Sequence, residues 1–191
     1  RLSGVKVSVS TRPERFLGLH FFNPVPLMKL VEVIRGKKTS DETVATAVAF
    51  AKKLGKMPIV LSDGPGFLVN RLLFPYMNEA IELLCDGASI KEIDRAATAF
   101  GMPMGPITLY DVIGLDTAFY AGAVMYEAFP DRCGASPLMV AMVKANRLGQ
   151  KTGVGFFSYK ENKDRGRPDP TLQPILEQVV RKHDKLSDEQ V

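Results

Sequence analysis

The sequence has few of the features that mark disulfide-rich, membrane-spanning or nucleic-acid-binding proteins. Its two cysteines, Cys85 and Cys133, lie far apart without metal-type spacing, so we expect both to be reduced thiols and predict no metal site. No apolar run approaches the roughly 18–20 residues that a membrane-spanning helix needs. With a net charge of +4 and no run of five basic residues, nucleic-acid binding has little support. We therefore expect a protein of the cytoplasm, with the mitochondrial matrix or peroxisome as alternatives.

Histidine is also scarce, which narrows the choice of a general base. His183 lies in the charged segment Arg181-Lys-His-Asp-Lys185, where a solvated side chain is expected. His20 lies in an apolar segment, where a charged imidazolium would be costly without a partner. A core histidine bonded only to backbone is the alternative interpretation.

The hydrophobic pattern indicates a mainly α-helical chain with an α/β part at its beginning. Strands are expected at 16–22, 30–34 and 58–61. Between the second and third strands a helix is expected, which begins at a capping box of Thr39 and Glu42 and ends at Gly55. Beyond the Gly64-Pro-Gly66 turn the pattern becomes helical, with a single further strand at 155–159. The expected helices are 67–84, a helix from Ser89 to about 100, one or two helices from 106 to about 129, 136–147 and 170–182.

Glu32 changes the interpretation of His20, because it too is an ionisable residue inside a buried-type strand. Two successive strands joined by a loop can place the two side chains together. A carboxylate on one imidazole nitrogen fixes the tautomer, leaves the other nitrogen free as a base and stabilises the imidazolium. Such a pair is suited to taking a proton from an alcohol, although it could also be structural and indicates no particular reaction.

Two glycine-containing segments do not fit the phosphate-binding motifs that they resemble. Gly64-Pro-Gly66 follows a strand and opens a helix, but the sixth position is Val69 and Pro65 removes a backbone donor, so we interpret it as a kink. Asn70 then lies in the first turn of the helix, either as a local cap or aimed at a substrate oxygen. The second segment is Gly149-Gln-Lys-Thr-Gly-Val-Gly155. A phosphate loop has its glycines before the lysine, whereas here two of the three follow Lys151. Lys151 could still reach an anionic cofactor.

Taken together, five segments resemble the L-3-hydroxyacyl-CoA dehydrogenase family in order and spacing. They are Leu19-His-Phe-Phe-Asn-Pro-Val25, Met28-Lys-Leu-Val-Glu-Val33, Asp63-Gly-Pro-Gly-Phe-Leu-Val-Asn-Arg71, Met102-Pro-Met-Gly-Pro106 and Lys151-Thr-Gly-Val-Gly-Phe156. The resemblance implies the trailing edge of a Rossmann-type NAD domain at 1–63 and an all-helical C-terminal domain at 64–182. Residues 183–191 would begin a second helical repeat.

The resemblance also implies the chemistry. His20 would be the catalytic base, Glu32 its paired carboxylate and Asn70 the contact to the reacting oxygen. Asn23 and Lys151 would contact NAD, and 3-hydroxyacyl-CoA would be the substrate. The family's glycine-rich loop, ribose-binding acid and active-site serine would belong upstream of Arg1, so we expect a fragment that is inactive by itself.

The continuation beyond the Lys151 turn is similar to the α-subunits of bacterial fatty acid oxidation complexes, in which a hydratase domain precedes the NAD domain. Such a parent would form a homodimer or a complex with a thiolase subunit. Two other functions stay open. One is a non-catalytic helical module for dimerisation, which would have little reason to keep His20 and Glu32. The other is an enzyme of the β-hydroxyacid or 6-phosphogluconate type, which typically uses a lysine base.

Overall fold

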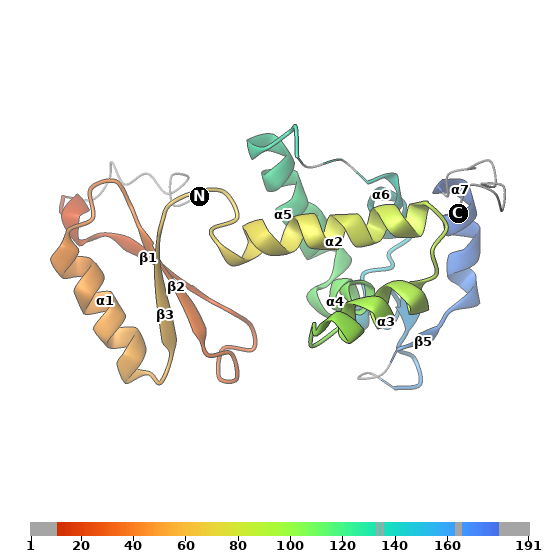
Figure 1. The fold of residues 1–191 in the computed structure, drawn as a ribbon, viewed down its shortest axis with the longest axis horizontal. Helices are drawn as coiled ribbons and strands as arrows, with labels where there is room; N and C mark the ends of the chain where they lie inside the picture. Colours follow the sequence, from red (N-terminus) through yellow and green to blue (C-terminus); the bar gives the residue numbers. More distant parts are fainter. Residues whose placement is uncertain (1–10, 133, 135, 163–165, 180–191) are drawn as a thin grey trace. The chain divides into compact units, whose positions relative to one another are not determined.

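The computed structural model describes residues 11–132, 134, 136–162 and 166–179, which fall into two compact units divided between Leu72 and Leu73 (Figure 1). Within the described residues no helix is long and apolar enough to cross a membrane. Several sequence expectations fall outside them: the chain start at 1–10, Cys133, the end of the last helix at 180–182, His183 and the helical repeat at 183–191. Cys85 is a buried free thiol, as expected.

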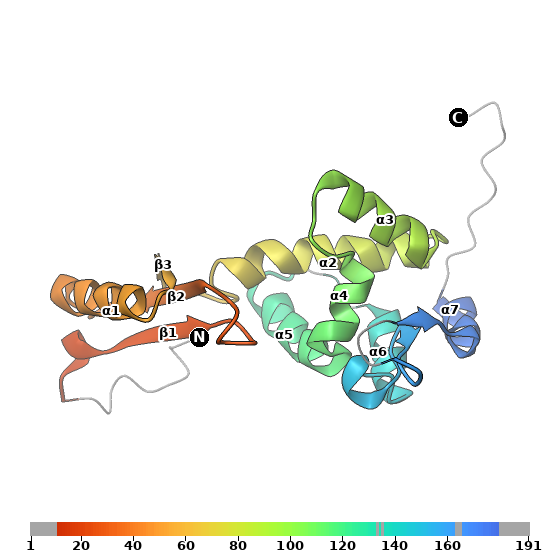
Figure 2. The same ribbon diagram turned by 90° about the horizontal axis from the view of Figure 1, so that it is seen from below.

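The first unit is a three-stranded sheet with one helix, and its strands agree with the expected segments. The strand order is β1-β2-β3, with β1 antiparallel to β2 and β2 parallel to β3. Val31, Val33 and Ile34 of β2 are fully or almost fully buried, because β2 is the central strand. The helix α1 lies along the sheet (Figures 1 and 2). The bounds are β1 Leu17–Phe21, β2 Leu30–Arg35, α1 Asp41–Lys53 and β3 Met57–Ser62, preceded by a 3₁₀ turn, η3 Pro13–Arg15.

The start of α1 corrects the expected capping box. Ser40, not Thr39, is the N-cap, and its Oγ accepts a hydrogen bond from the backbone N–H of Thr43. Thr39 is buried instead, where its hydroxyl donates to the carbonyl of Phe16. Two adjacent hydroxyl residues made the sequence ambiguous, and a long-range contact determined which of them caps the helix.

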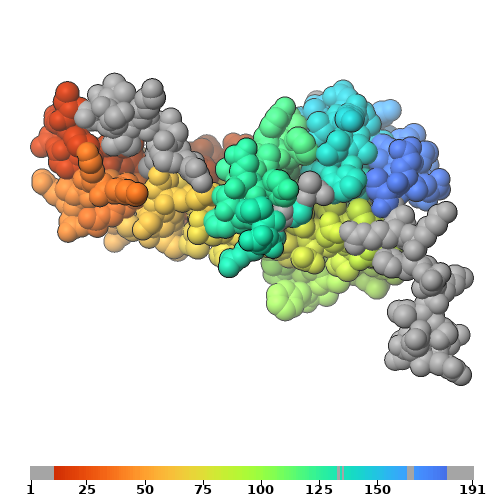
Figure 3. Space-filling view, turned by 90° about the horizontal axis from the view of Figure 1, so that it is seen from above, coloured from red at the N-terminus to blue at the C-terminus, as the bar shows by residue number. Residues whose placement is uncertain are grey.

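The second unit consists of helices around one apolar core. The core contains Met77 and Ile81 of α2, Ile107 of α4, Leu115 of α5 and Leu138 of α6. The amphipathic pattern that predicted these helices therefore faces a common interior. Figure 3 shows α5, coloured green to teal, on one face of the unit. The bounds are α2 Val69–Cys85, α3 Ile90–Phe100, α4 Pro106–Ile113, α5 Leu115–Ala128, α6 Pro137–Lys144 and α7 Gln173–Val179, with 3₁₀ turns η4 Gln150–Thr152 and η5 Pro170–Leu172. The first residues of α2, up to Leu72, belong to the first unit.

The capping box expected from Ser89 and Glu92 is confirmed at the start of α3, with the two residues bonded reciprocally. Two other details of this unit were ambiguous or wrong in the sequence interpretation. The segment after 106 is a pair of helices, because Gly114 has a φ of +96° and interrupts the chain between α4 and α5. The strand expected at 155–159 is shorter, β4 Phe157–Ser158, and pairs with a second strand that was not expected, β5 Arg167–Pro168.

A buried ion pair holds the end of the described chain to the helical unit. The Arg147 guanidinium donates to Asp169 at 2.8 Å, to the Thr171 hydroxyl at 2.8 Å and to the carbonyl of Gly155 at 2.9 Å. Arg147 and Asp169 are each about nine-tenths buried, and the nearby Thr171 and Arg147 donors lower the pKa of Asp169 against the opposing effect of burial. The segment beyond Asp169 therefore has a fixed attachment point.

Candidate active site

The register of the first two strands places His20 directly opposite Glu32. His20 of β1 and Glu32 of β2 are paired residues in the antiparallel ladder. Residues opposite each other in such a ladder point to the same face of the sheet. Their side chains meet, with His20 Nδ1 2.6 Å from Glu32 Oε2. The Glu32 side chain has no exposed surface, whereas 33% of the His20 side chain is exposed. His20 is therefore not the fully buried residue that its apolar segment indicated.

Glu32 is also bonded to the start of α2. Its second oxygen, Oε1, accepts hydrogen bonds from the backbone N–H groups of Leu68 and Val69, both at 2.9 Å. These are orphan donors at a helix N-terminus, where a negative charge is favoured. The two amides donate to one oxygen of an ionised Glu32. Its other oxygen, Oε2, then accepts a hydrogen bond from the Nδ1–H group of His20. The Nε2 atom of His20 then carries the free lone pair of a base.

Two aromatic rings contact the imidazole of His20. The ring of Phe22 lies edge-on at a centroid distance of 4.8 Å, and that of Phe67 is tilted at 5.5 Å. Phe22 follows β1, and Phe67 belongs to the turn that precedes α2. The imidazole is thus held by one hydrogen-bonding carboxylate and two rings, which is the arrangement expected of an oriented base rather than of a histidine bonded only to backbone.

The other predicted site residues are distributed over both units. Asn70 is the second residue of α2, next to Val69, whose amide binds Glu32. Asn23 is exposed in the loop after β1, three residues beyond His20. Lys151 belongs to the second unit, where its ammonium is paired with Asp116 near the start of α5. The first unit thus brings His20 and Glu32 together and holds Asn23 and Asn70 as well. Lys151 instead has a partner within the second unit, Asp116, that the sequence did not reveal.

Asp111 is a buried acid that the sequence interpretation missed. Its carboxylate accepts the backbone N–H groups of Phe156 and Phe157 at 2.8 and 2.9 Å. A Cβ on Gly155 would lie 2.0 Å from Asp111 Oδ1, and one on Gly149 would lie 2.2 Å from the Asp111 carbonyl oxygen. The two glycines around Lys151 therefore let the turn pack against Asp111. The signal was available, since Asp111 interrupts an apolar helix just as Glu32 interrupts an apolar strand.

Burial raises the pKa of Asp111 to about 6, against the opposing effects of the two amides and of Arg147. A carboxyl group whose pKa is higher in the folded chain than in the unfolded chain stabilises the fold when protonated. We expect this contribution to be fully present below pH 4 and to be lost as the pH rises to about 6, by up to about 3 kcal/mol. Urea unfolding across this range, compared with that of Asp111→Asn, measures it. An unchanged pH dependence in the variant would contradict the assignment.

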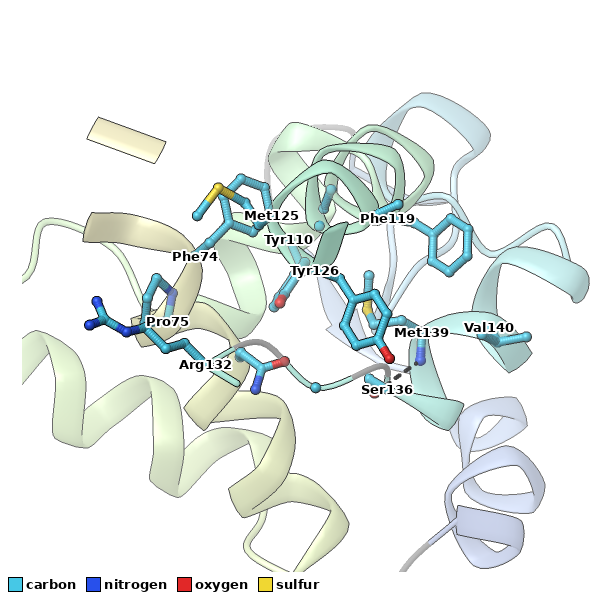
Figure 4. A pocket seen from close by; sticks show the side chains of 15 residues that line it. Phe74, Pro75, Tyr110, Phe119, Met125, Tyr126, Arg132, Ser136, Met139 and Val140 are labelled. Carbon is cyan, nitrogen blue, oxygen red and sulfur yellow. Dashed lines mark hydrogen bonds between the residues drawn. The ribbon is translucent and has the colours of Figure 1, made fainter. Parts of the chain in front are cut away.

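An apolar cavity of about 190 Å³ lies among the helices of the second unit. Figure 4 shows the rings of Phe74, Phe119 and Tyr126 around it, with Arg132 as its cationic side chain. Within the described residues no group of histidine, cysteine or acidic side chains is arranged to hold a metal ion.

Comparisons with known proteins agree with these observations. The family model "3-hydroxyacyl-CoA dehydrogenase, NAD binding domain" matches residues 5–64, and "3-hydroxyacyl-CoA dehydrogenase, C-terminal domain" matches 66–159. The fatty acid oxidation complex subunit alpha of Pseudomonas syringae pathovar tomato is 50% identical over 186 residues, 94% of this chain. That of Pseudomonas putida is also 50% identical over the same length. This chain spans only 26% of the length of each of these relatives.

Two solved structures extend the comparison. The (S)-3-hydroxybutyryl-CoA dehydrogenase of Ralstonia eutropha is 47% identical with a TM-score of 0.77, covering 81% of this chain and 56% of that one. The 3-hydroxybutyryl-CoA dehydrogenase of Escherichia coli K12 is 34% identical with a TM-score of 0.76, covering 96% of this chain and 37% of that one. The fold class expected from the sequence, a Rossmann-type part followed by a helical domain, is confirmed.

Proposed function

This chain belongs to the 3-hydroxyacyl-CoA dehydrogenase family, and we propose that it supplies the acid–base pair of an enzyme that oxidises (S)-3-hydroxyacyl-CoA to 3-oxoacyl-CoA with NAD. The single observation that carries the proposal is the 2.6 Å contact between His20 Nδ1 and the fully buried Glu32. This contact leaves the other imidazole nitrogen free on a partly exposed ring. An alcohol has to lose a proton when it is oxidised, and a neutral imidazole is suited to accept it.

In the proposed reaction, His20 Nε2 takes the proton of the C3 hydroxyl group. The Glu32 carboxylate stabilises the resulting imidazolium through Nδ1. Asn70, in the first turn of α2, donates its amide N–H to the C3 oxygen as the carbonyl forms. In the reverse direction the imidazolium of His20 returns its proton to the C3 oxygen. Because Glu32 is fixed by two amides, little reorganisation accompanies the proton transfer.

The cofactor of the proposed reaction is NAD, which when bound accepts the C3 hydrogen with its electron pair. The residues present fit this assignment. His20 and Glu32 can take up the hydroxyl proton, whereas no amino-acid side chain accepts a hydride, so a cofactor has to accept it. The exposed amide of Asn23 follows β1 three residues after His20, and we propose it as one contact to the cofactor. We propose Lys151 as the other; its ammonium would have to exchange Asp116 for an anionic group of the cofactor.

The proposed setting is a bacterial fatty acid oxidation complex in the cytoplasm, because curated relatives that are 50% identical to this chain carry that name. The proposed partners are accordingly a thiolase subunit or a second copy of the same chain. A non-catalytic packing module is the second candidate function. It is favoured by the outer side of α5, where Tyr120 and Val124 are 70% and 45% exposed.

The test is oxidation of (S)-3-hydroxybutyryl-CoA by the full-length gene product, followed as NADH formation. We expect turnover with the S enantiomer and none with the R enantiomer, because with the C3 oxygen and the acyl chain held in one arrangement only one enantiomer presents its C3 hydrogen to NAD. Sedimentation of the same sample addresses the second candidate. Self-association without NADH formation would favour the packing module and overturn the dehydrogenase proposal.

A further inference from the structure

Phe67 has a backbone conformation that normally favours glycine. Its φ is +48°, and Asn146 is the only other non-glycine residue with a positive φ in the described part of the chain. Left-handed backbone is tolerated by glycine and asparagine, but it is unfavourable for a bulky side chain. An aromatic residue at such a position is an outlier that points to a role for its side chain.

The left-handed residue comes directly before the two amides that bind Glu32. The N–H groups of Leu68 and Val69 both donate to Glu32 Oε1 at 2.9 Å. The turn is held on its other side by Arg71, whose guanidinium donates to the Pro65 carbonyl through Nε at 3.2 Å and through Nη2 at 3.1 Å. The backbone of Phe67 therefore directs the start of α2 onto the carboxylate.

The side chain of Phe67 acts on the other member of the pair. Its ring is half-buried and lies against the imidazole of His20 at a centroid distance of 5.5 Å. Glycine at this position would allow the same backbone without strain, but it would leave that side of the imidazole open. The turn thus contains a conformationally unfavourable residue whose ring makes a contact to His20 that glycine could not make.

We propose that Phe67 is a positioning residue that shields the His20–Glu32 hydrogen bond from water and fixes both partners from one point in the chain. The proposal rests on the proposed function, since shielding matters because His20 is the base. Its backbone sets the two amides on Glu32 Oε1, and its ring covers the bonded imidazole. Phe67 itself carries out no proton transfer.

The test is the rate at which the His20 Nδ1 proton exchanges with water, measured by NMR on the chain labelled with ¹⁵N-histidine. The chain has only two histidines, so comparison with His183→Gln assigns the signal. In Phe67→Gly we expect the exchange rate to rise at least about tenfold, because the bond opens to solvent more often. Phe67→Leu keeps an apolar side chain without the ring, and a smaller rise is expected.

Asn146→Gly is the matched control, because it places glycine at the other left-handed non-glycine position of the described residues, in the second unit. Its His20 exchange rate should equal that of the unchanged chain. If Phe67→Gly does not fold, Phe67→Leu decides the question. An unchanged exchange rate in a folded Phe67 variant would overturn the proposal. The measurement needs no turnover, so faster exchange in a chain without dehydrogenase activity would count against the proposed function alone.

Discussion

If the proposed function holds, replacing His20 with glutamine is expected to lower kcat for (S)-3-hydroxyacyl-CoA oxidation by about a thousandfold in the full-length gene product, within the range that a positioned general base contributes. Glutamine keeps the size and polarity of the side chain but cannot take up the hydroxyl proton at neutral pH. Because Glu32 Oε1 remains bonded to the amides of Leu68 and Val69, the fold is expected to persist. KM should change far less than kcat, since the missing group acts in the transition state.

The matched control for this substitution is His183→Gln, which removes the other histidine of the chain. His183 lies outside the described residues, in a charged segment, and its replacement should leave kcat unchanged. Steady-state NADH formation with both variants gives the comparison. Turnover of the His20 variant at the rate of the unchanged protein would show that another group is the base and that the 2.6 Å pair with Glu32 is structural.

Replacing Glu32 with alanine is expected to reduce the free energy of unfolding by about 3–5 kcal/mol, because each of its hydrogen-bond donors that loses its acceptor costs about 1–3 kcal/mol. The side chain has no exposed surface and accepts three hydrogen bonds, from His20 and from the amides of Leu68 and Val69. Without it, two backbone donors at the start of α2 lose their acceptor inside the protein. Denaturant unfolding measures the loss, and Glu42→Ala, an exposed position on α1, should change stability by less than about 0.5 kcal/mol.

Glu32→Gln separates the electrostatic role of this residue from its packing role. The amide oxygen of glutamine can still accept the two backbone N–H groups, while its NH₂ group would face His20 Nδ1. The imidazole would then have to accept at Nδ1 and carry its proton on Nε2, the nitrogen that should act as the base. We expect kcat to fall about a hundredfold, less than for the loss of His20 itself, because the imidazole remains. Wild-type rates would show that Glu32 is only structural.

The pairing of His20 with Glu32 was predictable because both are ionisable residues inside apolar strands joined by one loop. A two-residue periodicity and a short connection leave few registers, and in the observed register the two residues are directly opposite each other. The same reasoning applied to Asp111 would have found a second buried acid. The helices were equally accessible, because their apolar positions follow a helical period and face one core.

What escaped the sequence interpretation depends on contacts between distant residues or on backbone geometry. The partner of Lys151 is Asp116, 35 residues away, and no local pattern identifies it. The choice of Ser40 over Thr39 as a helix cap depends on the contact of Thr39 with Phe16. The left-handed conformation of Phe67 is unfavourable by local propensity and exists only because the surrounding turn imposes it.

The three hydrogen bonds of Glu32 also have a consequence for the order of folding. The bond to His20 closes a loop of 12 residues, whereas the bonds to Leu68 and Val69 close loops of 36 and 37. Longer loops cost more entropy to close, so the hairpin of β1 and β2 is expected to form before the start of α2 docks. A chain arrested between these two events would contain the complete hairpin and both site residues. Its carboxylate would still lack two of its donors, and the imidazole would not yet be held in the orientation of a base.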